Sequence, residues 1–151
     1  MHAAYNLARW LLGNDHDAED AVQDANLKAL RGFAAYRGDG AKAWYLAIVR
    51  NTCMNQLRSR RRLTTLDAEE DAEPDVGRPD LALFRAIDAE RLRHAIECLP
   101  PAWREMIILR EFEQMSYQEL AEVAQVPIGT VMSRLSRARQ RLQVLLCEET
   151  E

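Results

Sequence analysis

The chain has 151 residues, of which 48% are hydrophobic and 29% charged, with a formal net charge of −4. This length suffices for one ordinary domain or two small ones with a buried core. No apolar run approaches the roughly 18 residues that a membrane span needs, and no signal-peptide pattern opens the chain. The sequence therefore predicts a cytoplasmic protein without membrane insertion. Its cysteines, Cys53, Cys98 and Cys147, are odd in number and far apart, which indicates reduced thiols.

The first part of the chain, residues 1–62, has the pattern of three helices. A short apolar helix ends near Gly13, and a second helix runs from Asp15–Asp17 to about Gly32 with apolar residues three and four positions apart. A loop at 34–40 precedes a third, long helix from Ala41 to about Arg62. The polar face of the second helix carries Asp20, Gln23, Asp24 and Lys28.

The third helix has two distinct faces. At about 100° per residue, one face is expected in the core: Leu46, Val49, Cys53 and Leu57. The other is a stripe of mixed chemistry: Trp44, Ile48, Asn51, Asn55, Arg58 and Arg62. An aromatic ring that stacks on a base, amides that read base edges and arginines that hold phosphates suit single-stranded DNA. Two simpler interpretations stay open: Trp44 as a core residue, and the arginines at 58–62 as a solvated helix end.

An acidic segment separates the two halves of the chain. Residues 1–62 carry ten basic and six acidic side chains, a net charge of +4, whereas residues 63–80 carry one arginine and seven acids, a net charge of −6. The segment also contains Pro74, Gly77 and Pro79, so it is expected to be a flexible linker. Its acidity keeps it off DNA, although a linker that is merely solvated is the simpler interpretation.

The residues after the linker continue the helical pattern. An amphipathic stretch from Leu81 to Leu99 predicts a helix that Pro100–Pro101 end, and the prolines also start the next helix. The expected core residues of that next helix are Trp103, Met106, Ile107, Ile108, Leu109 and Phe112. His94 and Cys98 have the spacing of two metal ligands on one helix turn, but two ligands make a poor zinc site, and no metal site is predicted.

The C-terminal segment predicts a helix-turn-helix. Ser116 and Glu119 have the spacing of a capping box, so a helix is expected to begin there. The segment 125–127 interrupts the helical pattern, and Pro127 is tolerated at the start of the next helix. That helix contains four arginines and no acid between Ile128 and Leu146. A cationic helix after a tight turn suits a DNA major groove, whereas a solvated arginine face is the simpler alternative.

The expected faces of this helix separate core from DNA contacts. Four residues share the core face: Val131, Leu135, Ala138 and Leu142. Four others point away from it and can reach base edges: Ser133, Ser136, Arg137 and Gln140. Thr130, near the helix start, can reach a base or a phosphate. Arg134 and Arg141 lie at the flank, where a phosphate contact or a structural ion pair is expected.

These motifs resemble a known family. The segments Ser-Tyr-Gln-Glu-Leu-Ala (116–121) and Gly-Thr-Val-Met-Ser-Arg-Leu-Ser-Arg-Ala-Arg (129–139) resemble the minus-35-binding domain of bacterial sigma factors of the extracytoplasmic-function (ECF) group. Leu-Pro-Pro-x-x-Arg-Glu (99–105) is similar to the lead-in of that domain. Met132 and Ser136 stand at positions that vary within the family, so the resemblance implies the role but not the promoter sequence.

The resemblance extends to the first half. Ala-Glu-Asp-Ala-Val-Gln-Asp (18–24) is similar to the segment that docks on the clamp helices of the RNA polymerase largest subunit, which implies polymerase contacts by Glu19, Asp20, Gln23 and Asp24. Trp-Tyr-Leu-Ala-Ile-Val-Arg-Asn (44–51) followed by Arg58 resembles the segment that melts and reads the minus-10 element. Asn51 matches an asparagine that the family places near a flipped-out base.

The resemblance implies an all-α protein of two small helical domains. Residues 1–62 match sigma domain 2, residues 63–80 the linker, and residues 81–151 sigma domain 4 with its helix-turn-helix. The implied partners are promoter DNA and core RNA polymerase, through its clamp helices and flap, and an anti-sigma factor stays open as a third. Two departures stand out: the first helix is short, as if the N-terminus were shortened, and Asn26 replaces an aromatic that is common in the group.

Two other functions remain as alternatives. A helix-turn-helix regulator that binds DNA by itself requires a ligand-binding or receiver domain, and residues 1–62 resemble neither. A degenerate sigma-like protein that only binds a partner is expected to lack a DNA-binding face, whereas both faces look intact. No nucleophile–base pair, phosphate-binding glycine loop or metal cluster is evident, so neither an enzyme nor a cofactor is predicted.

Overall fold

The computed structural model describes residues 2–64 and 89–148. Its first three helices are α1 (His2–Leu12), α2 (Asp15–Gly32) and α3 (Ala41–Thr64), with a short 3-10 turn, η1 (Phe33–Ala35), after α2. Gly13 ends α1 with φ +87°, a left-handed conformation that glycine adopts without strain. The side chain of Asn14 then accepts a 2.8 Å hydrogen bond from the Asp17 backbone N–H, which caps α2. These bounds agree with the helices that the sequence predicts.

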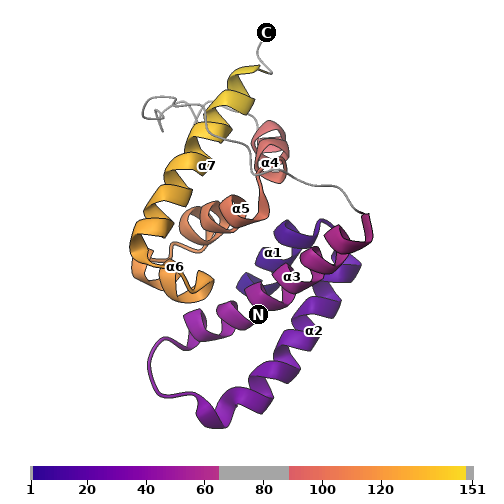
Figure 1. Ribbon diagram of the computed structural model, residues 1–151, viewed down its shortest axis with the longest axis vertical. Helices are drawn as coiled ribbons and strands as arrows, with labels where there is room; N and C mark the ends of the chain where they lie inside the picture. The colour runs from indigo at the N-terminus through magenta and orange to yellow at the C-terminus, as the bar shows by residue number, and fades with distance from the viewer. Residues whose placement is uncertain (1, 65–88, 149–151) are drawn as a thin grey trace.

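The first three helices bury their apolar stripes against one another. Leu7 and Leu11 of α1, Ala21 of α2 and the predicted core face of α3 are buried, although Leu57 is only half-buried. Small alanines on α2 allow its backbone to lie close to α1 and α3 (Figure 1). Burial raises the pKa of the Cys53 thiol to about 12, and the nearby Glu105 carboxylate adds to the shift.

The second group of helices comprises α4 (Ala89–Glu97), α5 (Pro101–Ile107), a π-helical turn η3 (Ile108–Phe112), α6 (Tyr117–Ala124) and α7 (Ile128–Glu148). The predicted capping box is confirmed: Glu119 N–H donates to Ser116 Oγ and Ser116 N–H donates to Glu119 Oε1, both at 3.1 Å. Gln125 ends α6 with φ +56°, and α7 begins directly after Pro127. All four predicted core residues of α7 are buried: Val131, Leu135, Ala138 and Leu142.

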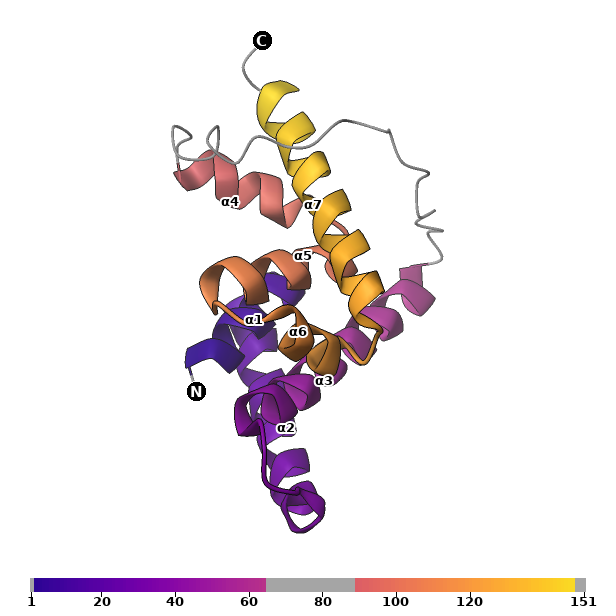
Figure 2. The same cartoon turned by 90° about the vertical axis from the view of Figure 1, so that its left-hand side faces the viewer.

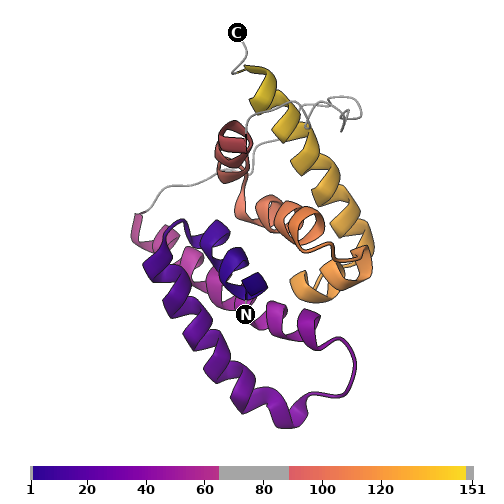
Figure 3. The same ribbon diagram turned by 180° about the vertical axis from the view of Figure 1, so that it is seen from behind.

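The two groups of helices pack against each other. α6 lies along α3 in two perpendicular views (Figures 1 and 2), and α1 lies between α2 and α5 when the molecule is seen from behind (Figure 3). Buried residues from both groups form one continuous cluster. The sequence predicts two separate domains but gives no indication that the first three helices pack against the later ones. Most of the predicted linker and the predicted helix start at Leu81 lie outside the described residues.

One predicted core residue is exposed. Phe112 leaves 52% of its surface accessible, although the sequence pattern predicts it in the core with Ile108 and Leu109. The π-helical turn adds a residue to the local repeat, so positions after Leu109 rotate away from the buried face. The Phe112 ring instead lies 6.1 Å, centroid to centroid, from Trp10 of α1.

Candidate nucleic-acid interface

The outer face of α7 carries most of the residues that the sequence predicts for contact with a DNA major groove. Ser133, Ser136 and Arg137 are exposed on the side opposite the buried stripe, and Arg141 is exposed further along the helix. Thr130 and Gln140 are half-buried. Because α7 has no acid before Glu148, this face combines hydroxyl, amide and guanidinium donors without a nearby carboxylate of its own helix. It therefore has the chemistry for base edges and phosphates.

Arg134 faces inward. Its side chain is 24% exposed, and its Nη1 lies 3.9 Å from Oε1 of Glu105, which is fully buried on α5. The flank position left two alternatives for Arg134, and the structure has the structural ion pair. Arg139 also has an acidic neighbour, with Nη2 at 3.2 Å from Glu111 Oε1. Two of the arginines of α7 thus bind its own group of helices.

Two exposed apolar residues on α7 were not predicted as contacts. Ile128 is 46% exposed and Met132 is 54% exposed, at the N-terminal end of the helix that carries Ser133. The sequence shows both as apolar residues outside the predicted buried stripe, but the contact prediction considered polar side chains alone. Large exposed apolar side chains beside polar ones can contact the methyl group of thymine in a major groove.

The predicted stripe on α3 is only partly accessible. Trp44, Ile48 and Asn51 are half-buried, whereas Asn55, Arg58 and Arg62 are exposed. The Trp44 ring packs 4.9 Å, centroid to centroid, from the Tyr36 ring, so it is a half-buried packing residue. Arg58 Nη1 donates to Asn55 Oδ1 at 3.3 Å. The stripe is continuous along α3, but its first half lies close to other side chains.

Arg50 forms hydrogen bonds both with the neighbouring Asn51 and with Glu105 of α5. Arg50 Nη1 donates to Asn51 Oδ1 at 3.2 Å, and the same guanidinium donates from Nε and Nη2 to Glu105 Oε2 and Oε1, at 2.8 and 3.1 Å. Burial raises the pKa of Glu105, although the Arg50 hydrogen bonds and the Arg134 charge oppose the shift. Arg50 and Glu105 each lie in a segment that resembles the family, but their pairing could not be predicted from the sequence because they are 55 positions apart.

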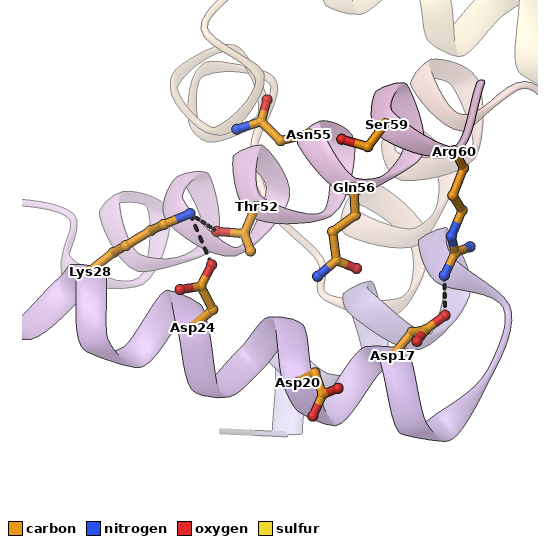
Figure 4. Close-up of a pocket in the computed structure, with 9 residues that line it drawn as sticks. All are labelled: Asp17, Asp20, Asp24, Lys28, Thr52, Asn55, Gln56, Ser59 and Arg60. Atoms are coloured by element: carbon orange, nitrogen blue, oxygen red, sulfur yellow. Dashed lines mark hydrogen bonds and ion pairs between the residues drawn. The ribbon is translucent and has the colours of Figure 1, made fainter. Parts of the chain in front are cut away.

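The acidic face of α2 borders a groove. Glu19, Asp20, Gln23 and Asp24 are all exposed. Figure 4 shows the groove between α2 and α3, which Asp20 and Asp24 line from one side and Thr52, Asn55 and Gln56 from the other. Lys28 Nζ lies 3.1 Å from Asp24 Oδ2 and donates to Thr52 Oγ1 at 3.2 Å. Two residues predicted for polymerase contact and one predicted for DNA contact therefore meet in one groove.

The basic end of α3 is not a purely solvated helix end. Arg60 pairs with Asp17 at one wall of the groove, and its Nη1 donates to the carbonyl of Leu12 at 3.2 Å. Arg60 thus satisfies a carbonyl at the C-terminus of α1, where a cation is favourable. Tyr45 donates its hydroxyl to Asn26 Oδ1, so the unusual Asn26 has a partner on α3.

The remaining polar residues offer little for a metal. His94 Nδ1, on α4, and Cys98 Sγ, just after the end of α4, lie 3.9 Å apart, and both residues are exposed. Over residues 2–64 and 89–148, no group of three or more His, Cys, Asp or Glu side chains gathers in a way that could hold a metal ion. Nor does any helix in these two ranges combine the length and the apolar character needed to cross a bilayer.

Comparison with known protein families gives two matches in order along the chain. Residues 1–63 match the model described as Sigma-70 region 2, and residues 89–142 match the model described as Sigma-70, region 4. Together the matched ranges contain the groove between α2 and α3 and the helix-turn-helix of α6 and α7.

Individual relatives agree with the family models. The chain is 37% identical over 157 aligned residues to the RNA polymerase sigma-H factor of Pseudomonas aeruginosa, covering 97% of this chain and 81% of the relative. It is 33% identical to the ECF RNA polymerase sigma-E factor of Escherichia coli, covering 83% and 72%. Its fold resembles the sigma factor RpoE of Bartonella quintana, solved in complex with the anti-sigma factor NepR, with a TM-score of 0.73 and 34% identity over 96% of this chain and 90% of that one.

Proposed function

Because this chain belongs to the sigma-70 family and to its extracytoplasmic-function group, we propose that it binds core RNA polymerase, reads minus-10 and minus-35 promoter elements and promotes DNA melting. Members of this family direct transcription initiation at specific promoters. Promoter recognition is supported above all by the acid-free outer face of α7, the second helix of the helix-turn-helix, which presents Ser133 and Arg137.

Minus-35 recognition is assigned to α7. Ser133, Ser136 and Arg137 are proposed to read base edges because they are exposed opposite the buried stripe. Thr130, Gln140 and Arg141 are proposed to add base or phosphate contacts at its margins. Arg134 belongs to the proposed site through its pairing with Glu105, which holds the helix in place, rather than as a reading residue.

Minus-10 recognition is assigned to the stripe on α3. Asn51 and Asn55 carry amides for an unstacked base, Trp44 and Ile48 supply apolar surface, and Arg58 with Arg62 supplies charge for phosphates: together they make up the proposed site on a single helix. Asn55, Arg58 and Arg62 are exposed, whereas the three members nearer the helix start are half-buried.

Polymerase binding is assigned to the acidic face of α2. Glu19, Asp20, Gln23 and Asp24 are exposed on this helix, and Asp20 and Asp24 line the groove. We propose that the clamp helices of the largest subunit dock here and that the flap binds the helices 89–148. Because a similar sigma factor was solved with an anti-sigma factor, we also propose an anti-sigma factor as a regulatory partner.

The sigma function predicts that free protein binds promoter DNA weakly. The chain is acidic overall and each proposed DNA face neutralises few phosphates, so most affinity must come from assembly with core polymerase. We expect a mobility-shift titration at physiological salt to show a sequence-specific complex with core polymerase and little binding without it. Tight, sequence-specific binding in the absence of core contradicts the proposal and favours a self-sufficient regulator.

Arg137 and Arg141 are expected to behave differently. Arg137→Ala removes a proposed base contact, so it should change the preferred sequence at one or two base pairs, at about 1–3 kcal/mol. Arg141→Ala removes a proposed phosphate contact, so it should weaken all sequences alike. The measurement is selection of promoter sequences by holoenzyme formed with each variant. An unchanged motif for Arg137→Ala shows that the reading face is assigned wrongly.

A further inference from the structure

Glu105 lies between two arginines from different parts of the molecule. Its carboxylate is fully buried on α5 and accepts hydrogen bonds from Nε and Nη2 of Arg50, on α3, at 2.8 and 3.1 Å. Arg134, on α7, approaches the same carboxylate with Nη1 at 3.9 Å from Oε1. One buried charge therefore has a two-point partner in the first group of helices and a more distant partner in its own group.

Arg134 is incompletely satisfied in this arrangement. Its Nη1 is buried and has no hydrogen-bond partner among the described residues. A buried guanidinium N–H without an acceptor is costly, and the nearest carboxylate is already held by Arg50. Closing the 3.9 Å gap between Arg134 Nη1 and Glu105 Oε1 would supply the missing acceptor.

The bond between Arg50 and Glu105 exists only while the two groups of helices are packed. Other contacts cross the same boundary: Arg104 Nη1 donates to the carbonyl of Trp10 at 2.7 Å, and Lys42 Nζ lies 3.5 Å from Glu113 Oε2. Glu105 and Arg134, by contrast, belong to one group of helices and remain together if the groups part.

Simultaneous reading of both promoter elements requires that the groups part. Elements centred at −10 and −35 are roughly 25 base pairs apart, or roughly 85 Å along B-DNA. The 24-residue α3 is roughly 36 Å long, and the ion pair joins it directly to the helices that support α7. The packed form is too short to place α3 and α7 on the two elements.

We propose that Glu105 is a positioning residue that exchanges partners: Arg50 binds it in the packed form, and Arg134 takes it over when the groups separate. The exchange keeps the Glu105 carboxylate paired before and after separation, so that its charge is never without a partner. It also couples separation to the seating of α7, because the new bond ties α7 to α5. The consequence for DNA reading rests on the proposed sigma function, whereas the exchange itself does not.

Packing can be measured with the native side chains. Lys28 and Lys42 are the lysines of this chain, and each lies beside a carboxylate: Lys28 beside Asp24 within α2, and Lys42 beside Glu113 across the boundary. Zero-length carbodiimide coupling followed by peptide mass spectrometry detects both cross-links, and the ratio of the Lys42–Glu113 cross-link to the Lys28–Asp24 cross-link reports how far the two groups of helices are packed.

We expect Arg50→Gln to lower this cross-link ratio about fivefold or more, because the packed form loses its buried ion pair. Arg93→Gln, which removes an exposed arginine paired with Glu97 within α4, is the matched control and keeps the parent ratio. A parent ratio for Arg50→Gln overturns the proposal.

Sharing of Glu105 can be measured by thermal unfolding. If either arginine can pair with Glu105, Arg50→Gln and Arg134→Gln should each be tolerated, whereas the double variant leaves the carboxylate unpaired. We expect the double variant to lose ~5 °C or more beyond the sum of the two single losses. Additive losses, with all variants shown to be helical by circular dichroism, overturn the exchange.

The positioning role has its own readout. With core polymerase, the ratio of transcripts from an intact promoter to those from a promoter with a scrambled minus-35 element measures how well α7 is seated. Glu105→Gln should lower this ratio about tenfold, whereas Arg50→Gln should keep it, because Arg134 still has its partner. A ratio is used so that any effect of Arg50 on its neighbour Asn51 cancels. Equal transcript ratios for Glu105→Gln and the parent overturn the positioning role. If the parent protein gives no core-dependent transcription, the proposed function is contradicted, and the cross-linking and unfolding measurements, which need no polymerase, still decide the exchange.

Discussion

Replacing Asp20 and Asp24 together with arginine is expected to weaken binding to core RNA polymerase by about a hundredfold or more, because reversing charges at a hot spot costs several kcal/mol. Both carboxylates are exposed on α2 and line the groove beside α3. Among the described residues, Asp24 pairs with Lys28 and Asp20 lies 3.4 Å from His16, and all four side chains are about half-exposed or more, so losing these pairs affects stability little. Helicity should therefore be retained.

The matched control is a single charge reversal elsewhere, compared with Asp24→Arg alone. Asp39→Arg alters an exposed acid in the loop before α3, outside the proposed polymerase contacts on α2 and on the helices 89–148. This control is expected to bind core like the parent, which separates a local effect from a general effect of charge. Binding is measured by co-purification with core and by titration of labelled protein. If the Asp20/Asp24 variant co-purifies as the parent does, α2 is not the docking face.

Asn51→Ala is expected to reduce open-complex formation more than closed-complex binding. The amide is proposed to read an unstacked base, and the loss of such a contact costs about 1–3 kcal/mol, roughly fivefold to a hundredfold in open complexes. Among the described contacts, the Asn51 side chain accepts one hydrogen bond, from the adjacent Arg50. Its removal therefore breaks no described hydrogen bond to another helix. The effect is therefore expected on DNA melting rather than on folding.

Permanganate footprinting of unpaired thymines measures melting, and a mobility shift at low temperature measures the closed complex. Asn6→Ala, which removes a half-buried amide on α1 outside the proposed sites, is the control and should melt promoters like the parent. Equal permanganate reactivity for Asn51→Ala and the parent removes Asn51 from the reading site.

Features that depend on a few neighbouring residues could be predicted from the sequence. The capping box at Ser116 and Glu119, the break at Pro127 and the buried stripe of α7 all follow from hydrogen bonds and side-chain spacing within one or two helical turns. The same local rules predict the bounds of α2 and α3. The helical class and the outward direction of Ser133 and Arg137 were therefore determined by the sequence alone.

Periodicity failed where the helix changed its repeat. Phe112 follows the three-four spacing of α5, but the π-helical turn rotates it outward, and its aromatic neighbour Trp10 is about a hundred positions earlier in the chain. The flank position of Arg134 likewise left two roles open. Only the position of Glu105, buried between α3 and α7, decided for an ion pair.

The tertiary structure alone decided how the two groups of helices meet. Arg50 binds Glu105 across 55 positions, and Arg104 binds the Trp10 carbonyl across 94. Such pairs leave no periodic mark, because an arginine or a glutamate suits an exposed helix position equally well. Their partners are set by which helix faces dock, and docking depends on the shape of whole buried surfaces rather than on the spacing within one helix.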